Sequence, residues 1–313
     1  ENANDSRSMP SATPSLLWLD DSRAAVPALV GPKAARLAQA RQTGLPVPPA
    51  FVLTTHAFRR GLDHDLQRAV LDAFQRLRDA LPSAWPLALA VRSSATAEDL
   101  DDASFAGVQA TVLDVADEAA LIGAIRTVWA SLHGEQARSY RARHGLAAES
   151  TGVIVQAQVP ARSAGIAFSR DPLTGEDITI VEAVRGLGEA LASGHAEPQQ
   201  WRLSPTGEVV AGPGQPVLSG QQLQAVRALL DTAVARFGGA LDIEWAEDGE
   251  RLWLLQARPI TTQPGSWFTD HLPEDDHLWT AGFLNERFTQ PVSPLGWSLI
   301  EGAMATLALG QPL

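Results

Sequence analysis

The spacing of apolar residues in the first half of the chain predicts helices that alternate with short strands. A helical pattern begins after Gly31-Pro32-Lys33 and stops at Gly44, because proline suits the first turn of a helix and glycine the position just past its end. The polar stretch 93–109, rich in small residues, is expected to be a loop. The other apolar runs predict a strand at 51–54, a helix at 64–80, a strand at 87–91 and helices at 118–131 and 134–143.

From about residue 150 onward the pattern indicates closely spaced strands. Apolar runs predict strands at 153–158, 164–169 and 178–183, a helix at 220–237, and a hairpin with strands at 241–245 and 252–256. We therefore expect an α+β fold in two lobes, 15–150 and 151–261, with mixed β-sheets and flanking helices. Outside the lobes we expect a disordered tail at 1–14, a linker at 262–278 and the incomplete start of a following domain at 279–313.

Composition narrows the classes of protein and of partner. The 313 residues are 45% hydrophobic and 19% charged, which is typical of a globular protein. A formal net charge of −12 disfavours nucleic acid as a partner, because a phosphate backbone needs a basic footprint. The absence of cysteine excludes disulfides and thiolate metal sites, and the histidines lack metal-site spacing. No apolar run could span a membrane and the polar start lacks a secretory signal, so we expect a cytoplasmic protein.

Among 24 basic residues the chain has a single lysine, Lys33. It lies at the predicted helix start after Gly31-Pro32, where backbone N–H groups and an ammonium group together could bind phosphate. Arginine does not replace a compact ammonium group freely beside phosphate oxygens, so the retention of one lysine favours this role. The alternative is an ordinary solvated surface lysine.

Arg92 directly follows the predicted strand 87–91, so its guanidinium group should emerge at the edge of a sheet. The residues after it are small or hydroxylated, which lets backbone N–H groups approach phosphates closely. An ordinary polar surface loop is the alternative. No Gly-x-x-x-x-Gly-Lys-Ser/Thr motif occurs, so a Walker-type nucleotide site is disfavoured.

The predicted hairpin carries four polar residues that suit a metal ion and a polyphosphate: Asp242, Glu244, Gln256 and Arg258. The first two lie two positions apart and share a strand face, as do the last two. Whether all four share one face depends on the register of the hairpin. They share a face if Trp245 pairs with Arg251, whereas a four-residue turn would place the two pairs of residues on opposite faces. Carboxylate and amide oxygens suit Mg²⁺, and a guanidinium group suits phosphate. Salt-bridged strand residues are the alternative.

Eight segments of the chain form an ordered set, with Val-Arg-Ser-Ser-Ala-Thr-Ala-Glu-Asp-Leu at 91–100 and Asp-Ile-Glu-Trp at 242–245 among them. The set resembles the ATP-binding domain of the phosphoenolpyruvate synthase group, which includes pyruvate phosphate dikinase and rifampin phosphotransferase. The resemblance covers about residues 30–261 and implies an ATP-grasp fold with ATP between two lobes. The segments are 31–34, 44–51, 91–100, 104–109, 171–175, 186–189, 242–245 and 254–261.

Each candidate residue acquires an implied role through this resemblance. Lys33, Arg92 and Arg258 would act on the polyphosphate as catalytic residues, and Glu244 and Gln256 would hold Mg²⁺ or Mn²⁺. The other residues implied to contact ATP are Ser104, Gly107, Gln109 and Thr111 over the phosphates, Gln156, Ala157, Val159 and Pro160 at the adenine, Glu189 near the ribose, and Asp242 beside the phosphates.

The resemblance also implies a reaction. ATP would donate its β-phosphate to a histidine on a swivelling domain, releasing AMP and phosphate, and that histidine would phosphorylate a small-molecule acceptor such as pyruvate or an antibiotic such as rifampin. The Gly-Gly-x-Thr-Ser-His-Ala motif that carries the histidine does not occur here. We therefore expect the ATP half-site of a phosphotransferase, in an N-terminal fragment of a longer enzyme. The alternatives are a free-standing ATP-grasp subunit with a separate histidine-bearing partner, and a non-catalytic ATP-binding module.

Three positions depart from the pattern of the family. Gly31-Pro32-Lys33 replaces Gly-Gly-Lys, and proline removes one N–H group that could have contacted phosphate. Val108 intrudes into the segment over the phosphates, and Gln158 stands where methionine is usual. Each could alter the affinity for ATP, but none removes a charged group.

Overall fold

The computed structural model describes residues 13–95, 111–131, 150–172, 174–187 and 198–260. The chain divides into two compact units, 1–264 and 265–313, and every described residue belongs to the first. The expected helix at 134–143, the linker and the segment 279–313 lie outside the described residues, as do residues 1–12 of the expected tail. Within the described part of the chain, no helix is long and apolar enough to cross a membrane.

The first sheet has five strands in the order β1-β2-β5-β3-β4. Alternate residues of its central strands enter two separate cores. Val153 and Val155 pack with the apolar residues of α4 and α5, whereas Ile154 packs with those of α2. The elements of this part are β1 (Leu16–Trp18), η1 (Ser22–Ala25), α1 (Pro27–Val30), α2 (Pro32–Gln42), β2 (Ala50–Leu53), α3 (Thr55–Arg60), α4 (His64–Asp79), β3 (Leu89–Ala95), β4 (Thr111–Val115), α5 (Glu118–Ser131) and β5 (Thr151–Ala157).

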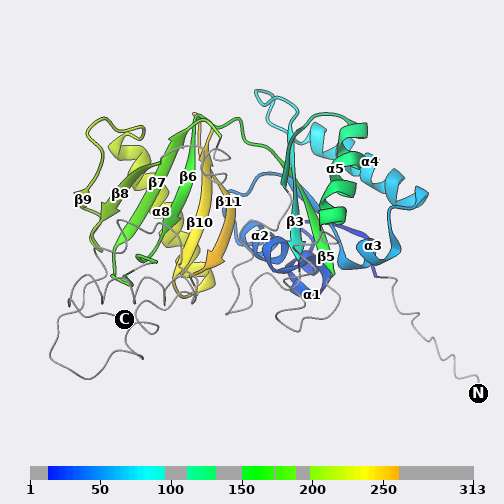
Figure 1. Cartoon of the computed structure of the whole chain (residues 1–313), viewed down its shortest axis with the longest axis horizontal. Helices are drawn as coiled ribbons and strands as arrows, with labels where there is room; N and C mark the ends of the chain where they lie inside the picture. The colour runs from blue at the N-terminus through cyan, green and yellow to red at the C-terminus, as the bar shows by residue number, and fades with distance from the viewer. Residues whose placement is uncertain (1–12, 96–110, 132–149, 173, 188–197, 261–313) are drawn as a thin grey trace, which may run out of the picture. The chain divides into compact units, whose positions relative to one another are not determined.

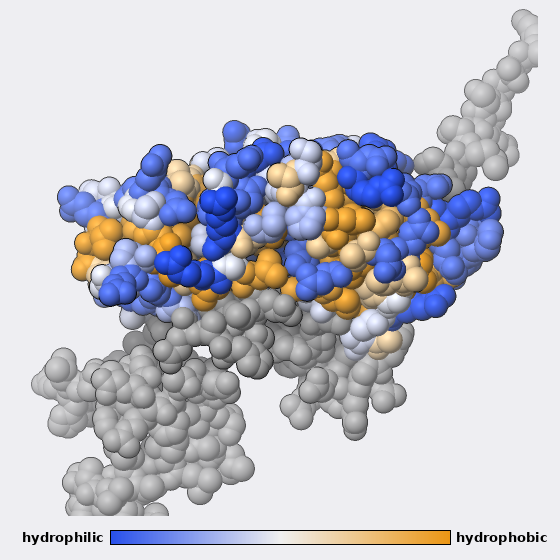
Figure 2. All heavy atoms as spheres, turned by 90° about the horizontal axis from the view of Figure 1, so that it is seen from above, coloured by the Kyte–Doolittle hydropathy of each residue, from blue (hydrophilic) through white to orange (hydrophobic). Residues whose placement is uncertain are grey.

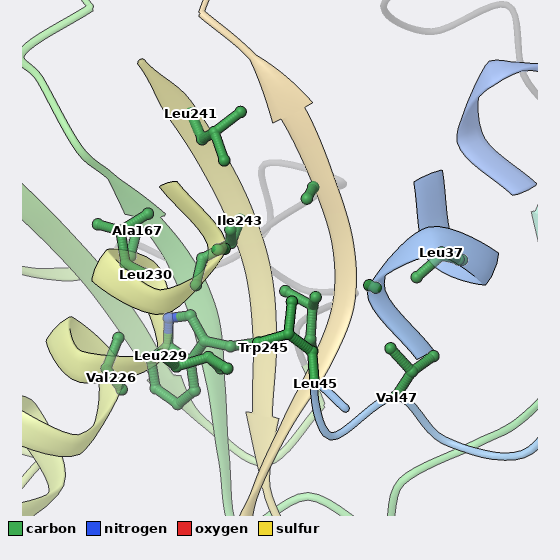
Figure 3. Close-up of a cluster of buried hydrophobic side chains, with 14 of the residues drawn as sticks. Leu37, Leu45, Val47, Ala167, Val226, Leu229, Leu230, Leu241, Ile243 and Trp245 are labelled. Atoms are coloured by element: carbon green, nitrogen blue, oxygen red, sulfur yellow. The ribbon is translucent and has the colours of Figure 1, made fainter. Parts of the chain in front are cut away.

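The second sheet has six strands in the order β11-β10-β6-β7-β8-β9, and α8 packs on one of its faces (Figure 1). Trp245 of β10 is fully buried there and reaches toward Val226 and Leu229 of α8 (Figure 3). The opposite face carries a small buried apolar cluster of Val159, Ala164, Ala246 and Trp253 at one end, and polar side chains such as those of Asp242 and Glu244 farther along the strands. The elements are β6 (Ser163–Phe168), β7 (Thr179–Arg185), β8 (Gln199–Leu203), β9 (Val209–Ala211), α8 (Gly220–Phe237), β10 (Leu241–Glu247) and β11 (Leu252–Pro259).

The ends of α8 follow from its flanking residues. Ser219 accepts a hydrogen bond from the N–H of Gln222, and the Gln222 side chain accepts one from the N–H of Ser219, which is a capping box. Gly238 ends the helix with a φ of 75°, a conformation that glycine adopts without strain. The helix predicted at 220–237 is therefore confirmed.

The α+β class is confirmed, but the expectation of mixed sheets is wrong for the described strands, because every strand pair is antiparallel. The short turn 248–251 joins the neighbours β10 and β11, whereas parallel neighbours need a long crossover. The strand expected to open the second lobe, β5, pairs with β2 and β3, so the change of sheet follows residue 157. In addition, β3 continues to Ala95, into the stretch expected to be a loop.

The surface of the described residues mixes hydrophobic and hydrophilic side chains, as Figure 2 shows for one face. The most exposed large hydrophobic residues are Val209, at 53%, and Val210, at 68%, both on the edge strand β9. This strand has only three residues, and a short edge strand offers few backbone groups for pairing with another chain.

Candidate functional site

The β10–β11 hairpin gathers the four polar residues singled out in the sequence. Asp242 lies opposite Arg258 and Glu244 opposite Gln256, and directly paired residues point to the same face of a sheet. The register differs from the one we considered, because Trp245 pairs with Leu254 rather than with Arg251. The register shifts between Glu244 and Trp245, which leaves Leu255 of β11 as the extra residue of a bulge. Successive residues of β10 alternate between the two faces, so Trp245 points into the core and Glu244 to the free face.

Glu244 lies between two arginines that come from different sheets. Its carboxylate is 3.6 Å from Nη1 of Arg92 on β3 and 3.7 Å from Nη2 of Arg258 on β11. Asp242 holds the other side of Arg258, with 3.2 Å between Oδ1 and Nε. The structure therefore unites Arg92 with the hairpin residues, and two guanidinium groups converge on one carboxylate.

Two buried donors of this site have no hydrogen-bond partner among the described residues: Nε of Arg92 and Nε2 of Gln256. A buried donor without a partner costs about 1–3 kcal/mol, and such a cost is common where a ligand supplies the missing acceptor. Phosphate oxygens are acceptors that both groups could use. The donor set thus fits an anionic, oxygen-rich ligand.

The same residues fit a hard divalent cation only together with a ligand. Glu244 and Gln256 offer a carboxylate oxygen and an amide oxygen on adjacent strands, whereas Mg²⁺ takes six oxygens and usually draws several from phosphates and water. No group of three or more His, Cys, Asp or Glu residues that could hold a metal alone occurs among the described residues. The chemistry of the donors therefore suits Mg²⁺ bound to a polyphosphate.

Lys33 is the second residue of α2. A hydrogen bond to Ser94 of β3 holds the start of this helix. The fully buried Oγ of Ser94 accepts a hydrogen bond of 3.0 Å from the N–H of Ala34. Gly31 caps the helix with a φ of 81°, and a Cβ atom there would clash with Ser94. Since Ser94 lies two residues beyond Arg92 on the same strand, this contact sets the helix carrying Lys33 against the strand carrying Arg92.

The expected contribution of helix-end N–H groups to phosphate binding is corrected by these contacts. Pro32 has no N–H group, the N–H of Ala34 is bound to Ser94, and the N–H of Ala35 donates to the carbonyl oxygen of Gly31. Three of the first four helical positions are therefore not available to a phosphate. The side chain of Lys33 is left as the main candidate at this helix end.

Removal of the Ser94 hydroxyl should affect both stability and ligand binding. We expect Ser94→Ala to lower the free energy of unfolding by about 1 kcal/mol, as for other lost helix caps, and to weaken ATP binding because Lys33 loses its fixed position. Ser219→Ala is a matched control, since it removes the cap of α8. Denaturant unfolding and calorimetry with ATP measure the two effects. Equal loss of ATP affinity in both variants would contradict a positioning role for Ser94.

The first sheet brings two further candidates to the face that carries Arg92. Thr111 of β4 pairs directly with Arg92. Gln156 pairs with Ala90, while Arg92 pairs with Ile154, so Gln156 and Arg92 are diagonal neighbours on one face. Gln156 is 1% exposed, and its Nε2 has no hydrogen-bond partner among the described residues. It is therefore a further buried donor suited to a ligand.

The remaining candidates at the adenine lie along the end of β5 and the segment that follows. The Ala157 side chain points to the opposite face from Gln156, so only its backbone could line the same site. Val159 is buried against Ala164, Ala246 and Trp253, at one end of the free face of the second sheet, and Pro160 is partly buried. Ser104, Gly107, Gln109 and Glu189 lie outside the described residues, as does Val108.

Gln158, in place of the usual methionine, has a structural role. Its Oε1 accepts a hydrogen bond of 2.9 Å from the N–H of Asp114, and its Nε2 donates one of 2.8 Å to the carboxylate of the same residue. Asp114 has a φ of 55°, which costs energy in a residue with a side chain. The amide thus stabilises a bend in β4 next to the adenine candidates.

The turn of the β10–β11 hairpin is held by Asp248. Burial disfavours its charged form, but hydrogen bonds from the N–H of Arg251 and from Nε1 of Trp253 outweigh this and lower the pKa of Asp248 below its usual value. The charged carboxylate of Asp248 therefore stabilises the folded protein at a pH above the pKa that this group has in the unfolded chain. The stabilisation is lost as the pH falls through the lower pKa of Asp248 in the folded protein. The register that aligns the four polar residues is therefore supported from the turn.

Comparison with known proteins identifies what the chain is similar to. The sequence profile of the pyruvate phosphate dikinase AMP/ATP-binding domain matches residues 60–213 and 206–267. A rifampicin phosphotransferase from Streptomyces sp is 37% identical, over 90% of this chain and 40% of that protein. The prodigiosin synthesizing transferase PigC from Serratia marcescens is 32% identical, over 88% of this chain and 37% of that protein.

A phosphoenolpyruvate synthase from Aeropyrum pernix is 30% identical, over 79% of this chain and 42% of that protein. The chain thus spans about two fifths of the length of these three relatives. Their names indicate three different acceptors or products, while the matched region is shared.

Proposed function

Because the chain belongs to the pyruvate phosphate dikinase AMP/ATP-binding domain family, we propose that it binds Mg-ATP as the donor half of a dikinase-type phosphotransferase. Its α+β structure with two antiparallel sheets is of the ATP-grasp class. In the proposed reaction the β-phosphate passes to a histidine of a swivelling domain in a longer chain or a partner subunit. ATP and one water molecule are consumed, and AMP, phosphate and phosphohistidine are formed.

The observation that carries this proposal is the convergence of Arg92 and Arg258 on Glu244. Without a ligand, the carboxylate partly neutralises the two guanidinium groups. When Mg-ATP binds, Glu244 and Gln256 would turn their oxygens to the metal, and both arginines would turn to phosphate oxygens. Mg²⁺ would neutralise the charge that develops on the phosphates.

The protein residues would contribute position and charge rather than covalent chemistry. Lys33, Arg92 and Arg258 would hold the polyphosphate so that the bond between the α- and β-phosphates lies in line with the incoming histidine. Asp242 orients Arg258 by accepting a hydrogen bond from its Nε. Val159 and Gln156 would lie at the adenine, and Thr111 near the phosphates.

The first test asks whether ATP binding depends on the carboxylate of Glu244, the proposed Mg²⁺ ligand. Glu244→Gln should weaken ATP binding in MgCl₂ by about tenfold or more, because a neutral amide holds Mg²⁺ less well than a carboxylate, and it should reduce the effect of EDTA. Calorimetry with ATP, with and without Mg²⁺, measures both effects. Glu250→Gln in the exposed hairpin turn is the control and should bind ATP like the parent protein.

Phosphoryl transfer separates the proposal from a non-catalytic ATP-binding module. Incubation with labelled ATP and a histidine-bearing swivelling domain of a relative should produce phosphohistidine and AMP. ATP binding without either product would favour the non-catalytic module. Absence of any ATP binding would contradict the proposal itself.

A further inference from the structure

The free face of the second sheet is ordered in rows that run across the strands. Because directly paired residues share a face, the register defines the members of each row. One row consists of Gln256, Glu244, Ile166, Glu182 and Gln200, on β11, β10, β6, β7 and β8. The next row consists of Arg258, Asp242, Phe168, Ile180 and Arg202.

On β10 and β11 the rows become more polar along the strands. On the side toward Val159 the adjoining row is apolar, with Trp253, Ala246, Ala164 and Val184. On the other side lies the row with Arg258 and Asp242 on β11 and β10, which face the proposed phosphates, whereas the members of this row on β6 and β7 are the apolar Phe168 and Ile180. A nucleotide on this face would therefore place its base at the apolar row and its phosphates over β10 and β11, between Arg258 and the proposed metal ligands. Its sugar would then lie beside the β6 and β7 members of the middle row.

The middle row contains a second carboxylate besides Glu244. Glu182 is partly buried, and its Oε1 accepts a hydrogen bond of 3.0 Å from Nε2 of Gln200. Ile166 lies between Glu182 and Glu244, so the two carboxylates stand two strand spacings apart, about 10 Å between their Cα atoms. This separation does not favour their sharing one metal ion, because Mg²⁺ ligands lie about 2 Å from the ion.

We propose that Glu182 accepts a hydrogen bond from a ribose hydroxyl of ATP and so distinguishes ribonucleotides from deoxyribonucleotides; this rests on the proposed function. A carboxylate is an acceptor only, which suits a sugar hydroxyl as donor. Gln200 occupies one side of the carboxylate and limits its rotation. Ile166 and Phe168, both partly buried, provide apolar surface beside it. The resemblance had implied Glu189 near the ribose, and Glu182 is a separate candidate placed by strand register.

The test compares the dissociation constants of ATP, 2′-deoxy-ATP and 3′-deoxy-ATP, each with Mg²⁺. The parent protein should bind at least one deoxy nucleotide about tenfold more weakly than ATP, because the deoxy sugar lacks the hydroxyl that donates to the carboxylate of Glu182. Glu182→Ala should weaken ATP binding to the level of that deoxy nucleotide and leave the affinity for the deoxy nucleotide nearly unchanged. Gln200→Leu should reduce the preference in part.

Glu208→Gln, in the exposed turn between β8 and β9, is the control and should keep the full preference. Glu182→Gln provides a variant of nearly equal size, and its preference should also fall. An unchanged preference in variants that bind ATP would overturn the assignment to Glu182 while leaving the proposed function intact, as would a parent protein that does not discriminate. A parent protein that binds no ATP would overturn both.

Discussion

Replacement of Lys33 by alanine is expected to weaken Mg-ATP binding by about ten- to a hundredfold. Hydrogen bonds to charged groups contribute about 1.5–3 kcal/mol, and Lys33 offers the only lysine ammonium group in the chain. Because Ser94, Pro32 and the Gly31 carbonyl leave little of the helix end for a phosphate, the backbone has few N–H groups with which to compensate. Calorimetry with ATP in MgCl₂ measures the loss.

Two variants and one reagent sharpen this test. Lys33→Arg should restore only part of the affinity, because a planar guanidinium group does not reproduce a compact ammonium group. Arg59→Ala, which removes an exposed cation at the end of α3, should leave binding unchanged. An amine-reactive acyl-phosphate analogue of ATP can label only Lys33 and the N-terminal amine, and ATP should protect Lys33. Labelling of Lys33 that ATP does not reduce would place this residue outside the site.

The sequence predicted best those elements whose ends are set by residues nearby in the chain. The ends of α8 are set by Ser219, Gln222 and Gly238, all within a few residues of the helix, and its bounds were predicted correctly. The strands β1 and β9 have three residues each, too few for a periodic pattern, and were not predicted. Strand direction depends on pairing between distant segments, so the expectation of mixed sheets had no local basis.

The site shows the same division between local and long-range signals. The alternation of Asp242 with Glu244 and of Gln256 with Arg258 is local, and it predicted that the two members of each pair share a strand face. Whether all four share one face depended on the register of the hairpin, and the register that we considered is not the observed one. The proximity of Arg92 to these residues depends on how β3 packs near the hairpin. No spacing of residues in the sequence indicates this packing. Ser94 could have been noticed only as a hydroxyl two positions after Arg92, and Glu182 becomes a candidate only when the register of four strands is known.

Truncation of Trp245 should have the largest effect on stability. Trp245→Ala is expected to lower the free energy of unfolding by about 3–5 kcal/mol, because the indole ring is fully buried between β10 and α8 and its removal leaves a cavity. Denaturant unfolding measures the change, and Val210→Ala is the control because Val210 is 68% exposed. A loss as small as that of Val210→Ala would mean that the core between sheet and helix is not packed as described.

Trp245→Phe separates lost packing from lost hydrogen bonding. Nε1 of Trp245 has no hydrogen-bond partner among the described residues, so phenylalanine gives up volume but no hydrogen bond. We therefore expect a cost of about 1–2 kcal/mol, well below that of alanine. Because Glu244 directly precedes Trp245 on β10, loss of the buried indole ring should let this part of the strand shift, and the alanine variant should also weaken ATP binding, even under conditions where it remains folded. The phenylalanine variant keeps an aromatic anchor at the bulge and should retain most of the affinity, which ties the geometry of the metal ligand to the core behind it.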